Sequence, residues 1–244
     1  MRRATLLLAA LLLTGCGATR HTPPAAKSQG ADPRAAGAAT SQVLYGLVRD
    51  GTGVIVVHHP GSVAFHDSGG FDSAVAAFER DAHARRVLVD GLPGAIGFRI
   101  PHAAVEASIE HWNREYLKRG AYVFRYLDTG GYSAEGDGVL VLPTRDPWAV
   151  IRAAGVNGIG YGLDTPAVVD WLRKLDALHH FTVYGAGADF VEGRFASAPT
   201  GQDALILARS MYSFDPDIVD QGTGTVEALA RVLEQTGTLY LWWD

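Results

Sequence analysis

The sequence predicts an α+β fold, in which a mixed β-sheet is packed with several amphipathic helices in a single globular domain with an N-terminal β-rich extension. Apolar residues between Val105 and Tyr116 recur at i, i+4, i+7 and i+11, which is typical of one helix face. The aromatic residues Tyr122, Phe124 and Tyr126 alternate with Val123, Arg125 and Leu127, the two-residue period of a strand. Strands and helices interleave without a regular βαβ repeat, which favours a mixed sheet over a doubly wound one.

The first half of the chain contains short β-rich segments separated by two helices. We expect a hairpin around Asp50–Gly53, a helix over residues 73–85 closing before a strand at 87–89, and a helix from about Val105 that Gly120 ends. The expected strands cover residues 43–48, 54–58, 87–89, 96–100, 122–127 and 139–142, with a glycine-rich loop at 130–138 before the last of them.

The second half is expected to be richer in helix. Asp146-Pro147 and Thr165-Pro166 each place a capping side chain before a proline, and predict helices to about Ala154 and Leu178. A helix is expected around residues 205–212, and Thr225 should cap another that ends at Gly237. The expected strands cover residues 181–184, 190–191 paired with 194–195 around Glu192-Gly193, and 239–243.

The N-terminus indicates where the protein is located. Arg2 and Arg3 precede an unbroken run of Ala, Leu and Thr over residues 4–13, followed by Gly15 and the only cysteine, Cys16. This pattern resembles a bacterial lipoprotein signal peptide, which implies cleavage before Cys16 and diacylation of its sulfur, a palmitate-type anchor. A membrane-spanning helix would need about 20 apolar residues, and an ordinary cleaved signal gives no reason for a cysteine at this position.

These features predict four regions. Residues 1–15 are the signal peptide, and residues 16–42 are a flexible tether because Ala, Pro, Gly, Ser and Thr cannot bury enough apolar surface to offset the entropy of ordering. Residues 43–92 form the N-terminal extension and residues 93–244 the main domain. We therefore expect a protein at the cell membrane, attached through lipidated Cys16 on the extracytoplasmic face.

Composition excludes several functions. The chain has 21 basic and 26 acidic residues, a net charge of −5, and loss of Arg2 and Arg3 leaves 19 basic residues and a net charge near −7. Nucleic acid is not an expected partner, because its binding requires a cationic face. Once Cys16 is acylated no thiol remains, which excludes disulfides, thiolate nucleophiles and cysteine-bound zinc.

The last third carries motifs of a known family. The segment from Ala204 to Asp217, Ile218-Val-Asp-Gln-Gly-Thr-Gly-Thr225 and the closing Leu241-Trp-Trp-Asp244 resemble DUF4253, a bacterial domain of unknown function. The stretches at residues 139–148, 157–162 and 191–195 are similar to it as well, so that the resemblance covers about residues 96–244. Where this family usually reads Phe-Cys-Pro-Asp, the chain has Asp215, so any chemistry of that cysteine is absent. The resemblance implies no reaction.

Three carboxylates offer one candidate site. Asp215, Asp217 and Asp220 lie within six residues and could converge on Mg²⁺ or Ca²⁺. The alternative is structural: Asp215 caps a short helix begun by Pro216 and ended by Gly222, with the other two carboxylates at its positive end. Capping explains the order of the residues without a metal, so neither a metal nor a cofactor is expected.

Other motifs have structural explanations. His66-Asp-Ser-Gly-Gly70 is expected to be a turn rather than a nucleophile site at Ser68. Neither His58-His59 nor His179-His180 can chelate a metal alone, and the glycine-rich segment 157–162 lacks the context of a phosphate loop. Trp242 and Trp243 should point to opposite faces of the last strand, so that one is buried; Trp243 is kept as a candidate binding residue.

Two functions remain. The preferred hypothesis is a lipid-anchored, non-catalytic binding module with a protein or small-molecule ligand, since no complete set of nucleophile, base and orienting group is present. The alternative is a metal-assisted hydrolase using Asp215, Asp217 and Asp220, with Glu192 or His180 as further groups. The two differ in whether the carboxylates converge on one cleft.

Overall fold

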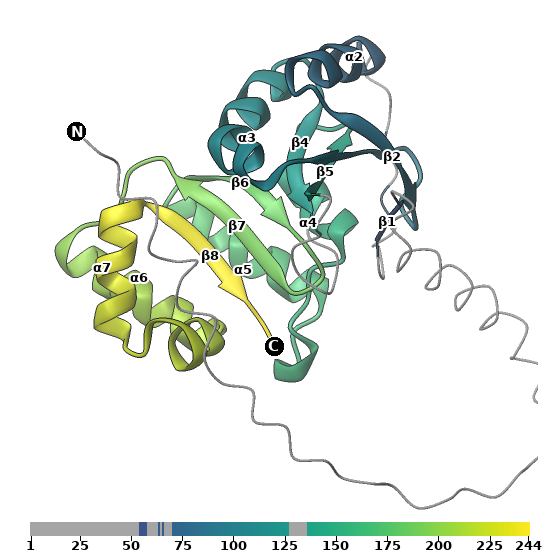
Figure 1. Ribbon diagram of the computed structural model, residues 1–244. Coiled ribbons are helices and arrows are strands. Elements are labelled where there is room, and N and C mark those ends of the chain that lie inside the picture. Colours follow the sequence, from purple (N-terminus) through teal and green to yellow (C-terminus); the bar gives the residue numbers. More distant parts are fainter. Residues whose placement is uncertain (1–53, 58–62, 64, 66–69, 127–135) are drawn as a thin grey trace, which may run out of the picture. The chain divides into compact units, whose positions relative to one another are not determined.

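The computed structural model describes residues 54–57, 63, 65, 70–126 and 136–244. Within them lies one eight-stranded mixed sheet of order β1-β2-β3-β5-β4-β6-β7-β8, which confirms the predicted α+β class (Figure 1). The pairs β1–β2 and β4–β6 are parallel, and the other neighbours are antiparallel. No helix in this part of the chain is long and apolar enough to cross a bilayer.

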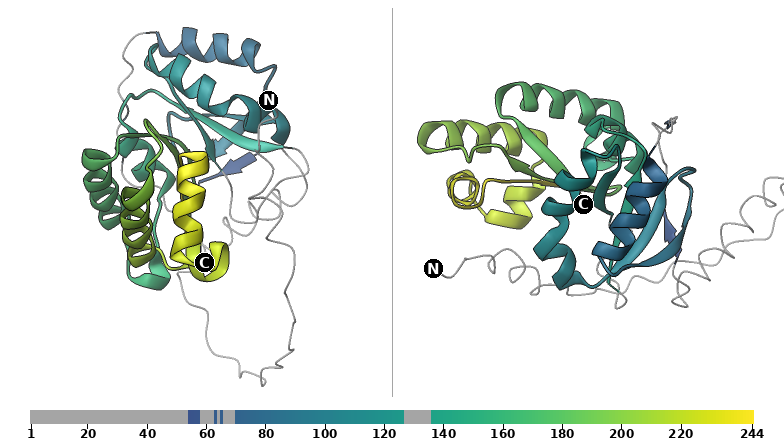
Figure 2. Two further views of the ribbon diagram at one scale, coloured as in Figure 1. Left: turned by 90° about the vertical axis from the view of Figure 1, so that its left-hand side faces the viewer. Right: turned by 90° about the horizontal axis from the view of Figure 1, so that it is seen from above.

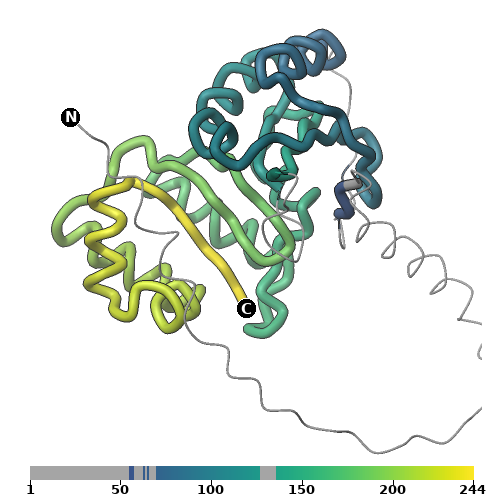
Figure 3. The backbone as a smooth tube through the Cα atoms, in the orientation of Figure 1, coloured from purple at the N-terminus to yellow at the C-terminus, as the bar shows by residue number. Residues whose placement is uncertain are grey.

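The strands and helices follow the expected order closely. The strands are β1 Val54–Val56, β2 Arg85–Asp90, β3 Ile96–Ile100, β4 Tyr122–Tyr126, β5 Asp137–Leu142, β6 Phe181–Ala186, β7 Phe190–Phe195 and β8 Thr238–Trp242. The α-helices are α2 Phe71–Asp81, α3 His102–Leu117, α4 Pro147–Ala154, α5 Thr165–Leu178, α6 Gly201–Phe214 and α7 Val226–Thr236. Two short helical turns, η1 Ile159–Tyr161 and η2 Ile218–Thr223, complete the described elements, and Figure 3 traces the path of the backbone.

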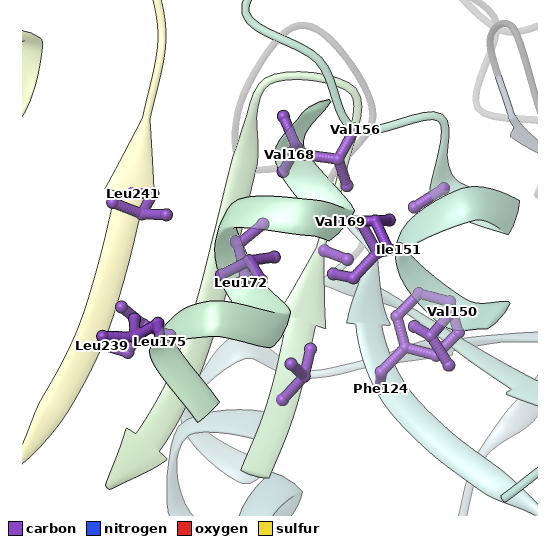
Figure 4. Packing of buried hydrophobic residues seen from close by; sticks show 14 of the residues in the cluster. Phe124, Val150, Ile151, Val156, Val168, Val169, Leu172, Leu175, Leu239 and Leu241 are labelled. Carbon is purple, nitrogen blue, oxygen red and sulfur yellow. The ribbon is translucent and has the colours of Figure 1, made fainter. Parts of the chain in front are cut away.

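Two hydrophobic clusters pack on opposite faces of the sheet, because successive side chains of a strand alternate. On β4, Phe124 belongs to the larger cluster, with buried residues of α4, α5, α6 and α7, whereas Val123 belongs to the smaller one, with α2 and α3. Figure 4 shows part of the larger cluster, where Leu172 projects from α5 and Leu241 from β8. Figures 1 and 2 show α2 and α3 near β3 and β4, and α6 and α7 near the β8 end of the sheet.

Several predicted helix ends are confirmed. The carboxylate of Asp146 accepts a hydrogen bond from Trp148 N at 2.9 Å, and Gly155 ends α4 in the left-handed conformation, with φ of 68°. Thr225 accepts from Ala228 N at 3.1 Å, and Gly237 ends α7 with φ of 61°. These are the contacts that satisfy unpaired amides and carbonyls at helix ends.

Three local predictions were wrong. Asp164, not Thr165, caps α5, because its carboxylate accepts from Ala167 N at 2.9 Å and Thr165 is already helical. Residues 190–195 form the single strand β7 rather than two pieces that pair with each other. A Cβ at Gly193 would lie 2.7 Å from Thr182 O, so this glycine allows a close approach of β6 instead of a reversal.

The third error concerns the segment after α6. Asp215 does not open a helix there; Asp217 occupies the N-cap position of the π-helical turn η2, and Gly224, with φ of 77°, ends it instead of Gly222. The wide turn arises because Gly224 N donates to Val219 O at 2.8 Å, five residues back. The predicted strand at 43–48, the hairpin turn at 50–53, His58-His59 and Ser68 lie outside the described residues.

Candidate functional site

The carboxylates of Asp215 and Asp217 hold the backbone of the last residues of the chain. Both are buried, with 0 % and 3 % exposure. Asp215 Oδ2 accepts from Trp242 N at 2.7 Å, and Asp217 Oδ2 accepts from Asp244 N at 2.9 Å. The segment after α6 is thereby bonded to the last residue of β8 and to Asp244, two residues further on.

The third carboxylate has a different partner. Asp220 is exposed, and its Oδ1 accepts from the Tyr212 hydroxyl at 3.1 Å, which raises the pKa of that tyrosine. Among the described residues no group of three or more His, Cys, Asp and Glu side chains is arranged to hold a metal ion. The three aspartates share a sequence neighbourhood but point to separate partners.

The two buried carboxylates differ in their protonation. Burial raises the pKa of Asp215 to about 7, and the charge of Asp217 adds to that effect, while amides of Trp242, Ile218 and Asp217 act in the opposite direction. Burial would also raise the pKa of Asp217, but hydrogen bonds from Asp244 N, Tyr161 and Gln221 outweigh it and lower the value. Near neutral pH the carboxylate of Asp217 is therefore ionised, whereas the pH lies close to the pKa of Asp215.

Trp243 lies in the core beside these aspartates, with 4 % exposure, whereas Trp242 is half-buried, as the alternation of the strand predicts. The Trp243 ring meets Phe214 edge to face at a centroid distance of 5.7 Å, and Phe214 stacks on Trp171 at 4.3 Å. A Cβ at Gly158 would lie 2.8 Å from Trp243 Cδ1, so the glycine-rich segment lets its backbone pass against the indole. Trp243 is thus a packing residue of this corner.

The turn that begins at Gly158 presents apolar side chains to solvent. Ile159 is 77 % exposed and Tyr161 is 43 % exposed. The turn is nevertheless firmly held: Gly158 N and Leu163 O lie 2.9 Å apart in an isolated bridge, and the Tyr161 hydroxyl donates to Asp217 Oδ1 at 2.6 Å. That bond, followed by burial, raises the pKa of Tyr161 to about 12, so it stays a donor at neutral pH.

A second polar cluster, which the sequence analysis missed, surrounds Arg125 on β4. This residue is 6 % exposed, and its guanidinium donates to Glu106 Oε1 of α3 at 2.6 Å and to the Glu192 carboxylate of β7. Asp137 Oδ2 lies 3.8 Å from Arg125 Nη1 and 3.0 Å from His102 Nδ1. The sequence contained one signal for this cluster, a single arginine within the alternating strand 122–127. It lies on the face opposite the tyrosines.

The electrostatics of this cluster are those of a buried ion pair. Burial raises the pKa of Glu192, and the charge of Arg125 offsets only part of that effect. Burial alone would lower the pKa of Arg125, but Glu192 and Glu106 outweigh it and raise the value. A Cβ at Gly185 would lie 2.9 Å from Glu192 Oε2, so this glycine makes room for the carboxylate. Within the described cluster the opposite charges pair with one another and link α3 to the three strands β4, β5 and β7.

The remaining hydrolase candidates have partners other than the three aspartates of the cluster. Glu192 is held by Arg125, as above, and His180 lies at the end of α5, where its side chain is 79 % exposed and its Nδ1 is 3.9 Å from Asp176. An apolar depression of about 580 Å³, lined by residues that include Phe65, Phe71 and Ile96, contains none of the candidate residues.

Comparison with known proteins identifies one family. Residues 138–244 match the family described as a domain of unknown function, DUF4253. Every motif on which the sequence resemblance rested lies within or next to this range, although the resemblance itself extended back to about residue 96. No curated protein and no solved structure matches the chain. The matched range includes the elements from β5 to β8.

Proposed function

We propose that the protein is a lipid-anchored, non-catalytic binding module of the bacterial cell envelope. The N-terminal pattern ending at Cys16 supports the anchor. Each buried methylene contributes about 0.8 kcal/mol, so a diacylated cysteine holds a protein at a membrane more stably than a single chain. The tether over residues 16–42 would then separate the folded domain from the lipid surface.

The observation that carries the binding part of the proposal is the η1 turn. A rigid turn that exposes an isoleucine and a tyrosine loses little entropy when a partner covers it. By contrast, the buried carboxylates that could have served hydrolysis already accept hydrogen bonds from the backbone of β8 and the residue that follows Trp243. The exposed isoleucine and tyrosine side chains give the turn an apolar surface, which suits a protein partner.

The binding surface can be tested with a photo-crosslinking amino acid placed at Ile159. We expect covalent adducts to a protein partner in intact cells after illumination, because the side chain lies at the centre of the proposed contact. Leu178 is the matched control, since it is 79 % exposed but lies at the end of α5. Absence of adducts at position 159, or equal adducts at both positions, would refute this surface.

The anchor can be tested with Cys16→Ser. The native chain should enter the detergent phase in a Triton X-114 separation and incorporate labelled palmitate in cells. The variant should lose the label and remain in the aqueous phase or keep its uncleaved signal, because serine has no thiol to acylate. Labelling that persists in the variant would contradict attachment at Cys16.

A further inference from the structure

The η1 turn lies where four segments of the chain are hydrogen-bonded to one another. Asn157 N, just before the turn, donates to Ala188 O at 2.9 Å, in the loop between β6 and β7. The Tyr161 hydroxyl donates to Asp217, which follows α6, and the same carboxylate accepts from Asp244 N after β8. Residues that are far apart in the sequence therefore form one corner of the described fold around the turn.

This corner is acidic. Its four segments, residues 155–171, 186–191, 210–225 and 238–244, contain no lysine, arginine or histidine. They contain seven aspartates, which are Asp164, Asp170, Asp189, Asp215, Asp217, Asp220 and Asp244. Two basic residues close to η1 in sequence are directed elsewhere, because Arg152 pairs with Asp146 at 3.0 Å and the Arg173 guanidinium lies over the Trp148 ring. The chain therefore supplies negative charge beside the turn, and these segments supply no positive charge.

Three of the seven aspartates can face another molecule. Asp164, Asp220 and Asp244 are exposed, and in the part of the chain that the structure describes none of them forms an ion pair. The other carboxylates next to the turn, those of Asp215 and Asp217, are buried and make no contact outside the chain. The exposed residues therefore form the rim of the surface that Ile159 and its turn present.

We infer that the partner of the η1 turn presents basic side chains, arginine above all, around an apolar pocket that receives Ile159. The inference rests on the binding surface proposed above and adds the chemistry of its partner. A contact that excludes water from the turn also covers the exposed carboxylates, and cations on the partner compensate for the loss of water around them. Arginine suits both parts of the surface, because its planar guanidinium bonds carboxylates through two N–H groups and stacks on rings such as that of Tyr161.

The same charges disfavour two other occupants. A second copy of this chain, bound through the same surface, would place aspartates opposite aspartates, and like charges across an interface oppose association. A lipid surface rich in anionic head groups would be repelled for the same reason. A basic protein surface is therefore the occupant that the charges of this corner favour.

The test neutralises the exposed rim in the full chain that carries the photo-crosslinking amino acid at position 159. Asp164→Asn, Asp220→Asn and Asp244→Asn, combined, should lower the yield of adducts in intact cells about tenfold, the factor in affinity that three exposed ion pairs together contribute. Asparagine caps helices as well as aspartate does, so the start of α5 is kept. In isolated cell envelopes, the yield of the unaltered rim should also fall as the KCl concentration rises, because salt screens exposed charges.

The matched control makes the same change of charge elsewhere. Asp72→Asn, Asp90→Asn and Asp203→Asn lie at exposed positions outside the four segments, and their combination should keep the yield of the unaltered chain. Circular dichroism of the purified chains identifies the variants that retain the fold. If the triple rim variant does not fold, Asp220→Asn combined with Asp244→Asn takes its place, since neither residue caps α5.

The outcomes separate this inference from the proposed binding surface. Adducts at position 159 that are undiminished in the folded rim variant, or that do not respond to KCl, would leave the surface standing and overturn the basic partner. An adduct with the mass of two copies of the chain, or an adduct to lipid, would overturn it as well. Absence of adducts in the unaltered chain would refute the binding surface and, with it, this inference.

Discussion

Replacement of Arg125 by alanine is expected to lower the free energy of unfolding by about 3–5 kcal/mol, the cost of removing one partner of a buried ion pair. Glu192 and Asp137 would be left without their cation, at side-chain exposures of 15 % and 1 %. For a domain of this size the loss corresponds to a fall in melting temperature of roughly 10 °C. Urea titration followed by circular dichroism measures the change in free energy, and a thermal scan measures the fall in melting temperature.

Arg86 provides the matched control for this prediction. It pairs with Glu79 at 2.8 Å, but the two side chains are 50 % and 37 % exposed, so Arg86→Ala should cost less than about 1 kcal/mol. Combining Arg125→Met with Glu192→Gln should recover part of the loss, since the substitutions remove both charges of the pair. Equal losses for Arg125→Ala and Arg86→Ala would show that burial of the Arg125 pairs adds nothing to the free energy of unfolding.

Replacement of Asp215 by asparagine is expected to stabilise the protein above neutral pH. Its pKa is about 7 in the folded protein and near 4 when unfolded, so the folded state binds the proton more tightly. Stability therefore falls as pH rises from about 4 to 7, and the penalty is fully present above that range. Asparagine cannot ionise yet can accept from Trp242 N, so we expect a gain of about 2–4 kcal/mol at pH 8.

The pH dependence supplies the check on this prediction. The gain from Asp215→Asn should shrink between pH 7 and pH 4, because the native carboxyl becomes protonated over that range. Asp220→Asn is the control, because it makes the same chemical change at a carboxylate that is exposed to solvent rather than buried. Melting curves recorded across this range give the comparison. A gain that is the same at pH 4 and pH 8 would mean that burial of charge is not its source.

Local patterns were sufficient for most of the fold. The apolar stripe from Val105 to Tyr116 depends only on neighbours in sequence, and so do the proline and glycine that bound α4. The structure contains both features as predicted. One wrong prediction involved a choice between adjacent residues with similar propensities, since Asp164 and Thr165 can both cap a helix. The wide turn at η2 was missed because its hydrogen bonds depend on how residues 217–224 pack.

The candidate site was less predictable, because its contacts join distant segments. Asp215 and Asp217 lie two positions apart in the sequence. Each accepts a hydrogen bond from the backbone amide of a residue 27 positions further along the chain. Similarly, Arg125 and Glu192 are 67 positions apart, and no local period links them. The fold decides such pairs, since strand order brings β4, β6 and β7 together.

The glycine at position 185 has an evolutionary consequence. A methyl group there would lie 2.9 Å from Glu192 Oε2 and 3.0 Å from its Cβ, so the two positions cannot vary independently. Homologues that retain the Arg–Glu pair should retain glycine at 185, and lineages that acquire alanine there should already have shortened or lost the acid at 192. Covariation between these two columns of an alignment would record the order in which such changes can occur.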